Sequence, residues 1–123
     1  MNETKKILIC DDDEGILDML EMVFEDSPYT IIAEQNSLNV KGLVESQSPD
    51  LVVLDLWMPV LSGDQVLKIL RKNPSTEDLP VIIISASREG QQIAAKAGAT
   101  GYISKPFDFD ELMNMVDRLI NKN

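Results

Sequence analysis

Five polar side chains stand at the ends of apolar runs in this chain, and their types suit the chemistry of a phosphoryl group. They are Asp11, Asp12, Asp55, Ser85 and Lys105. Carboxylates brought close together repel one another, and they respond by holding a proton or by binding a cation. Asp oxygens are hard ligands that suit Mg²⁺, which keeps several waters and accepts a phosphate oxygen. An ammonium and a hydroxyl at the same place would complete a set that holds a phosphoryl group for attack by an aspartate.

This chemistry requires the side chains to meet, and the pattern of apolar residues predicts how. Short apolar runs alternate with stretches of helical spacing, which is typical of βα units around a parallel sheet. Three runs are continuously apolar and predict central strands, covered on both faces: Ile7–Cys10, Leu51–Leu54 and Val81–Ile84. Two more mixed runs, Tyr29–Glu34 and Gly101–Ser104, predict the edge strands.

Five helices are predicted between and after these strands. Apolar residues recur at helical spacing over 16–24 and 112–120, and each stripe can pack on the sheet. Ser62 and Gln65 stand three apart and predict a capped start for the third helix. The second and fourth helices, around 40–44 and 93–97, have thin apolar faces.

The chain therefore predicts one α/β domain over residues 1–123, with a doubly wound parallel sheet of five strands and five flanking helices. With right-handed crossovers and the strand order 2-1-3-4-5, the first and third strands lie side by side where the order reverses. Ligands bind at that point, beyond the carboxyl ends of the strands. Asp11, Asp12 and Asp55 are expected to converge there.

Composition excludes several classes of function. The net charge of −10 repels phosphate backbones and anionic lipid, so we expect no direct binding to nucleic acid or membrane. No apolar run approaches the roughly 20 residues that span a bilayer, and the single cysteine, Cys10, lies in an apolar run; both fit a cytoplasmic protein. The chain has no histidine, which excludes Ser-His-Asp catalysis and a phosphohistidine on this chain. An activated phosphate must come from another molecule.

Four segments resemble the receiver domains of two-component response regulators, and the resemblance extends over essentially the whole chain. They are ILICDD at 7–12, PDLVVLDLWMP at 49–59 with Gly63 after it, VIIISA at 81–86 and GYISKPF at 101–107. The segments stand in the order of that family, and each covers the end of a predicted strand. The resemblance implies the receiver fold, a five-stranded parallel sheet with five helices.

The resemblance also implies roles for the residues of the site. Asp55 matches the phosphoacceptor, Asp12 a direct ligand of Mg²⁺, and Asp11 an acidic partner that holds the metal through water. Trp57 matches the residue that offers its backbone carbonyl to the metal. Lys105 matches the lysine that pairs with the acceptor and then with the phosphate.

Further matches concern the response to phosphorylation. Ser85 matches the hydroxyl residue that moves toward the phosphate, Tyr102 the aromatic residue whose ring swings inward behind it, and Ala86 the small residue that leaves room. The family also has a cis bond before the proline at Pro106. The implied function is a phosphorylation-operated switch that signals through its fourth and fifth strand–helix units. It is not an enzyme, although it assists its own phosphoryl transfer and hydrolysis.

The partners implied are a histidine kinase or histidine phosphotransfer protein and a downstream protein or output domain, with the chain a monomer or a phosphorylation-dependent dimer. Alternatives remain. Asp11, Asp12 and Asp13 could simply cap the first helix. The fold could serve as a constitutive docking module without phosphoryl turnover. A hydrolase of the haloacid-dehalogenase type would need a second acid where this chain has Trp57.

Overall fold

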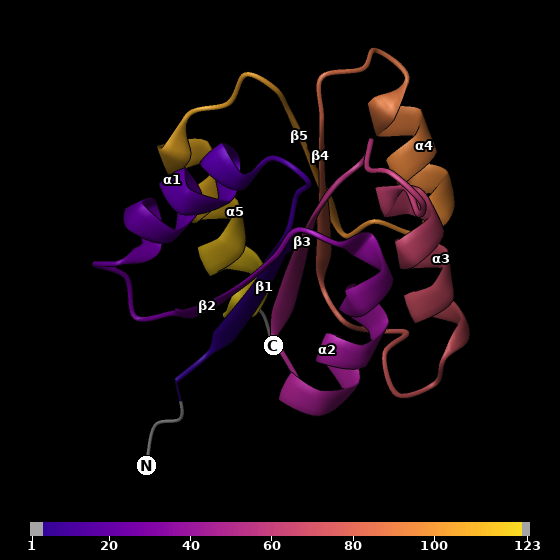
Figure 1. Ribbon diagram of the computed structural model, residues 1–123, viewed down its shortest axis with the longest axis horizontal. Helices are drawn as coiled ribbons and strands as arrows, with labels where there is room; N and C mark the ends of the chain where they lie inside the picture. The colour runs from indigo at the N-terminus through magenta and orange to yellow at the C-terminus, as the bar shows by residue number, and fades with distance from the viewer. Residues whose placement is uncertain (1–3, 122–123) are drawn as a thin grey trace.

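Five strands form one parallel sheet in the computed structural model, which describes residues 4–121 (Figure 1). The elements alternate strictly between strand and helix, apart from one short 3₁₀ helix. In chain order they are β1 (Lys6–Cys10), α1 (Glu14–Phe24), β2 (Thr30–Glu34), η1 (Ser37–Asn39), α2 (Val40–Gln47), β3 (Leu51–Asp55), α3 (Gly63–Lys72), β4 (Val81–Ser85), α4 (Gly90–Ala97), β5 (Gly101–Ser104) and α5 (Phe109–Ile120). Residues 1–3 and 122–123, which the sequence assigns to the same domain, lie outside the described residues.

The strand order is β2-β1-β3-β4-β5, which confirms the predicted fold class. Adjacent strands are parallel throughout. Every residue of β3 and β4 is buried, whereas β2 and β5 keep partly exposed positions. The predicted division into central and edge strands is therefore confirmed, since β2 and β5 are the two outer strands of the sheet.

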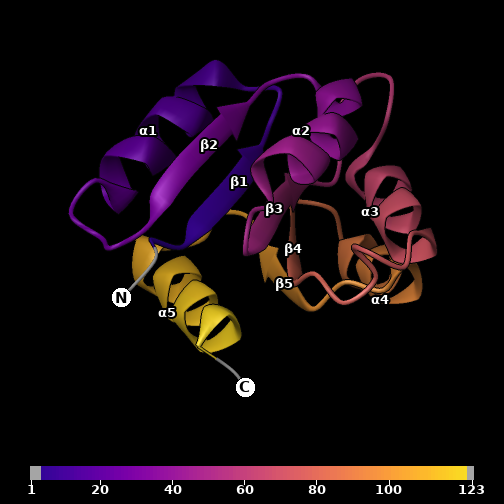
Figure 2. The same cartoon turned by 90° about the horizontal axis from the view of Figure 1, so that it is seen from below.

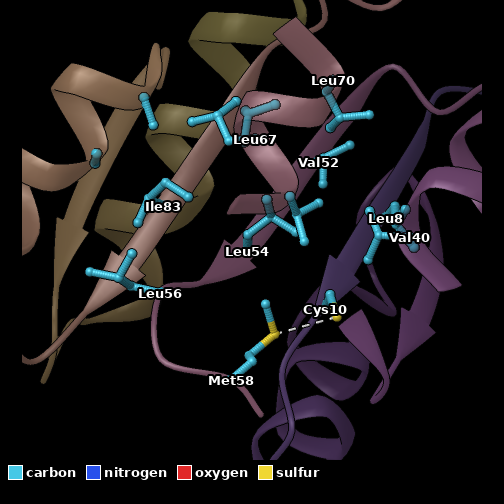
Figure 3. Packing of buried hydrophobic residues seen from close by; sticks show 14 of the residues in the cluster. Leu8, Cys10, Val40, Val52, Leu54, Leu56, Met58, Leu67, Leu70 and Ile83 are labelled. Carbon is cyan, nitrogen blue, oxygen red and sulfur yellow. Dashed lines mark hydrogen bonds between the residues drawn. The ribbon is translucent and has the colours of Figure 1, made fainter. Parts of the chain in front are cut away.

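The sheet separates two apolar cores. Helices α1 and α5 cover one face and α2, α3 and α4 cover the other (Figures 1 and 2). Successive strand residues point to opposite faces, so Ile7 and Ile9 pack in the core with α1 and α5, while Leu8 and Cys10 pack in the other core. Figure 3 shows this second core, where Cys10 Sγ lies 3.5 Å from Met58 Sδ.

The structure differs from the predicted strand ends in a way that affects the site. Strands β3 and β4 each extend one residue beyond the predicted end, so Asp55 and Ser85 are the last residues of their strands. Asp55 pairs with Ile84, and Ser85 with Ser104, in the regular register of the sheet. The backbones of both residues are thereby fixed by ladder hydrogen bonds, so neither side chain is carried on a loop.

Helix starts hold the connections at this edge of the sheet. Asp13 Oδ1 accepts hydrogen bonds from the backbone N–H groups of Gly15 and Ile16, at 2.9 and 3.3 Å, and so caps α1. The capped start predicted for the third helix is present at α3, where the Ser62 backbone N–H donates to Gln65 Oε1 at 2.9 Å. The η1 turn before α2 was not predicted.

Candidate functional site

Three carboxylates from two neighbouring strands meet at the carboxyl edge of the sheet. Asp11 and Asp12 follow β1, and Asp55 ends β3, the strand next to it. One oxygen from each carboxylate lies within 4.8 Å of the others. Asp11 and Asp55 are buried while Asp12 is exposed. The convergence expected from the topology is therefore present, and the cluster opens to solvent on the side of Asp12.

Lys105 lies across this cluster. It follows β5, and its backbone N–H donates to the carbonyl of Ser85 at 2.9 Å, which fixes its position next to β4. Its Nζ donates to Asp55 Oδ1 at 2.9 Å and lies 3.6 Å from Asp11 Oδ2. The peptide bond from Lys105 to Pro106 is cis, as the family resemblance implies. One ammonium thus bridges two buried carboxylates.

The surroundings of the site shift the pKa values of Asp55, Asp11 and Lys105 upward. Burial raises the pKa of Asp55 above its ordinary value, against the lowering effect of the hydrogen bond from Lys105. Burial likewise raises the pKa of Asp11, although the Asp13 backbone N–H donates to its Oδ1 at 2.9 Å. Burial alone would lower the pKa of Lys105, but its contacts with Asp55 and Asp11 together raise it. The two partly buried carboxylates share the single ammonium of Lys105. The cluster therefore keeps excess negative charge, which a further cation would stabilise.

The helix-capping interpretation of the three successive acids applies to one of them. Asp13 caps α1 through its side chain, as described above. Asp11 instead accepts the Asp13 backbone N–H and faces Lys105, and Asp12 contributes an oxygen to the cluster. The capping alternative therefore does not account for Asp11 or Asp12.

Ser85 and Tyr102 are in contact beneath the loop that joins β4 to α4. The Ser85 side chain is buried, and its Oγ accepts the Ser87 backbone N–H at 3.0 Å. Tyr102 Oη donates to the carbonyls of Ser85 and Ser87, at 3.3 and 3.4 Å. The tyrosine ring therefore already reaches under the β4–α4 loop.

The loop from β3 to α3 encloses the site on another side. Gly63 packs against the backbone of Asp55, since a Cβ on it would lie 2.5 Å from the Asp55 carbonyl oxygen. Trp57 is 55% exposed and lines a groove of about 430 Å³ with Lys68 and Lys96.

The same loop contains Val60, whose φ of 71° is a left-handed conformation that β-branched residues rarely adopt. No sequence signal indicates it.

An apolar depression of about 380 Å³ adjoins the site on the side of α1. Lys105 belongs to both, so the depression begins where the carboxylate cluster ends. Its other lining residues come from α1, from the loops after β4 and β5 and from the start of α5: Ile16, Met19, Ala86, Pro106, Phe107 and Phe109. Sequence reasoning missed this surface, because its residues come from three separate stretches of the chain and only some of them lie in the segments that resemble the family.

Comparison with known proteins decides the family. Residues 7–117 match the family described as the response regulator receiver domain. The chain belongs to this family. As a receiver domain it is a regulatory module of phosphorylation-based signalling in two-component systems. Within residues 4–121, no helix combines the length and apolar character needed to cross a membrane.

Individual relatives agree with this assignment. The chain is 37% identical to sporulation initiation phosphotransferase F of Bacillus subtilis over 122 residues, covering 98% of this chain and 95% of the relative. The receiver domain of Francisella response regulator 1452 superposes with a TM-score of 0.87 at 34% identity, covering 96% of this chain and 98% of that one. The receiver domain of the sensor histidine kinase PA1611 from Pseudomonas aeruginosa superposes at 0.89 with 22% identity, covering 98% and 100%, and has magnesium coordinated in its active-site cleft.

The receiver domain also matches longer proteins. It spans about half the length of several transcriptional regulators whose sequences it matches.

Proposed function

We propose that this receiver domain accepts a phosphoryl group on Asp55 from a phosphohistidine and signals by a change in the surface around α4. The observation that carries the proposal is the position of Asp55. Its carboxylate is fixed at the end of β3, hydrogen-bonded to Lys105 at 2.9 Å and clustered with Asp11 and Asp12. No hydrolase-type second acid stands two residues after Asp55, because that residue is Trp57.

The transfer step forms one bond and breaks one. A carboxylate oxygen of Asp55 attacks phosphorus, the P–N bond to the donor imidazole breaks, and the imidazole leaves with the bond's electron pair. The product is an acyl phosphate on Asp55. Lys105, already at hydrogen-bond distance from Asp55 and close to Asp11, is placed to pair with a phosphoryl oxygen as charge builds there.

The carboxylate set fits Mg²⁺. Three hard oxygen ligands lie within 4.8 Å of one another, with Asp12 exposed to solvent, and this suits an ion that keeps several waters. We assign Asp11, Asp12 and Asp55 to the metal, together with the backbone carbonyl of Trp57. When bound, the ion would neutralise negative charge between the acceptor carboxylate and the incoming phosphoryl group. The Pseudomonas neighbour with magnesium in its cleft supports the assignment.

The apolar depression beside Lys105 is the surface on which we place the phosphodonor. A donor imidazole must reach Asp55, so its protein has to cover the rim of the site. The exposed side chains at that rim include Met19, 44% exposed, and Phe109, 36% exposed, which favour an apolar partner surface. A histidine kinase or histidine phosphotransfer protein that presents its histidine from an apolar helix face has the matching chemistry.

The signal is expected to leave through Ser85 and the elements beyond it. A phosphoryl group on Asp55 adds negative charge that attracts the Ser85 hydroxyl. Moving that hydroxyl breaks the hydrogen bond from the Ser87 backbone N–H, and this releases the loop whose carbonyls accept from Tyr102 Oη. The β4-α4-β5-α5 surface would change its packing and be read by a downstream protein or output domain.

Intact-mass measurement tests the proposal. The protein is incubated with Mg²⁺ and phosphoramidate, a small donor with a P–N bond, alongside Asp55→Asn and the exposed control Asp18→Asn. We expect one phosphoryl group on the native protein and on Asp18→Asn, and none on Asp55→Asn or in the presence of a chelator. If Asp55→Asn gains as much mass as the native protein, Asp55 is not the acceptor. If no protein gains mass and Mg²⁺ leaves the Tm unchanged, the proposal fails and the alternative of a constitutive docking module is favoured.

A further inference from the structure

The first turn of α4 packs directly on Ser85 and Tyr102, and a glycine permits this contact. Gly90, the first residue of α4, is buried. A Cβ on Gly90 would stand 2.5 Å from Tyr102 Oη and 2.9 Å from both Ser85 Oγ and Ser85 Cβ. Carbon and oxygen atoms do not pack this closely. A larger residue at position 90 therefore forces a neighbouring side chain or the helix start to move.

The groups around Gly90 are held in place by hydrogen bonds. Tyr102 Oη donates to the carbonyls of Ser85 and Ser87, and the Ser87 backbone N–H donates to Ser85 Oγ. Gly90 itself donates its backbone N–H to the carbonyl of Ser87 at 3.2 Å. Hydrogen bonds thus connect the 85–87 loop to the Tyr102 hydroxyl and to the start of α4. The three groups can pack this closely because Gly90 has no side chain. Figure 1 shows β4, β5 and α4, the three elements involved, side by side.

We propose that Gly90 is a positioning residue: its lack of a side chain leaves the room in which Tyr102 Oη lies under the 85–87 loop, and it brings the first turn of α4 into direct contact with Ser85. The steric contact itself needs no phosphoryl group, whereas its consequence for signalling rests on the proposed function. When the Ser85 hydroxyl moves toward phosphorylated Asp55, the helix start loses its contact with Ser85 Oγ, while Ser85 Cβ stays beside it. Tyr102 and the first turn of α4 are then free to shift together.

The chain offers a matched control. Gly42 also lies in a helix, α2, and a Cβ on it would meet no heavy atom within 4 Å. Replacing a helical glycine by alanine raises stability where space allows, because the unfolded chain loses conformational freedom. We therefore expect Gly42→Ala to raise the Tm by about 2–4 °C, and Gly90→Ala to lower it by about 3–10 °C as overpacking outweighs the same gain.

The experiment uses protein without Mg²⁺ or phosphodonor, so its outcome is separate from that of the proposed function. Ring resonances of Tyr102 are assigned by their loss in Tyr102→Phe and compared by NMR among the native protein, Gly42→Ala and Gly90→Ala. We expect them to move in Gly90→Ala alone. We also expect Tyr102→Phe, which removes the closest atom, to reduce the Tm loss caused by Gly90→Ala. An unmoved ring in Gly90→Ala, or an equal change in Tm with and without the tyrosine hydroxyl, overturns the proposal.

Discussion

Replacing Lys105 with methionine should destabilise the protein in the absence of divalent cations and strengthen its binding of Mg²⁺. Lys105 Nζ lies 2.9 Å from Asp55 Oδ1 and 3.6 Å from Asp11 Oδ2. Removing one partner of a buried ion pair costs about 3–5 kcal/mol. The Lys105 side chain is 24% exposed, so solvent screens part of this interaction, and we expect a loss of about 2–3 kcal/mol in the free energy of unfolding.

The same substitution removes the Lys105 ammonium, which competes with Mg²⁺ for the carboxylates of Asp11 and Asp55. An ammonium and a divalent cation held by the same carboxylates repel by about 2 kcal/mol even at the dielectric constant of water. The Lys105→Met variant should therefore bind Mg²⁺ at least about tenfold more tightly. Saturating Mg²⁺ should then recover more stability in the variant than in the native protein.

Urea unfolding followed by circular dichroism, with a chelator and with Mg²⁺, measures both effects, and Trp57 fluorescence follows the metal titration. Lys41→Met is the matched control, because it removes the same charge from an exposed i,i+4 pair with Glu45 at 3.6 Å. That pair should be worth only about 0.3–0.5 kcal/mol. The reasoning is refuted if Lys105→Met matches Lys41→Met in stability without Mg²⁺, or if their affinities for Mg²⁺ are the same.

Three further expectations test other parts of the structure. Burial raises the pKa of Asp11, so its ionised form opposes folding, and Asp11→Asn should raise the Tm at pH 7 without Mg²⁺. This gain should shrink in acid, where the native carboxyl takes up its proton, and Tm measured against pH checks it. Gly63→Ala places a carbon against the Asp55 carbonyl and should cost at least about 2 kcal/mol in urea unfolding. Burial raises the pKa of the Cys10 thiol to about 12, so a thiol reagent at pH 8 should label it only in unfolded protein.

The fold was predictable because the sheet imposes strong local patterns. Continuous apolar runs such as Val81–Ile84 require cover on both faces, and this separates central from edge strands before topology is considered. The positions of Asp11, Asp12 and Asp55 then follow from the strand order, since parallel strands end at one edge. The strand ends were less predictable, because Asp55 and Ser85 continue the ladder although their side chains are polar.

Contacts between segments distant in sequence could not be predicted from the spacing of apolar and polar residues. The role of Gly90 depends on Tyr102, twelve residues further on, lying under the start of α4. The left-handed Val60 contradicts the usual preference for glycine or asparagine in that conformation. Spacing and residue type predict which elements form, but packing at a loop is decided by the tertiary neighbours.

The sheet places most of the proposed donor surface and the α3–α4 surface on opposite sides of the molecule. The proposed donor surface draws most of its residues from α1 and from the β5–α5 connection, whereas Gly90 and α3 belong to the opposite side. Substitutions more than about 7–10 Å apart, without shared partners, combine additively. A chimera that takes only α1 from another receiver should therefore change its choice of kinase, while its downstream specificity stays with the β4-α4-β5-α5 surface.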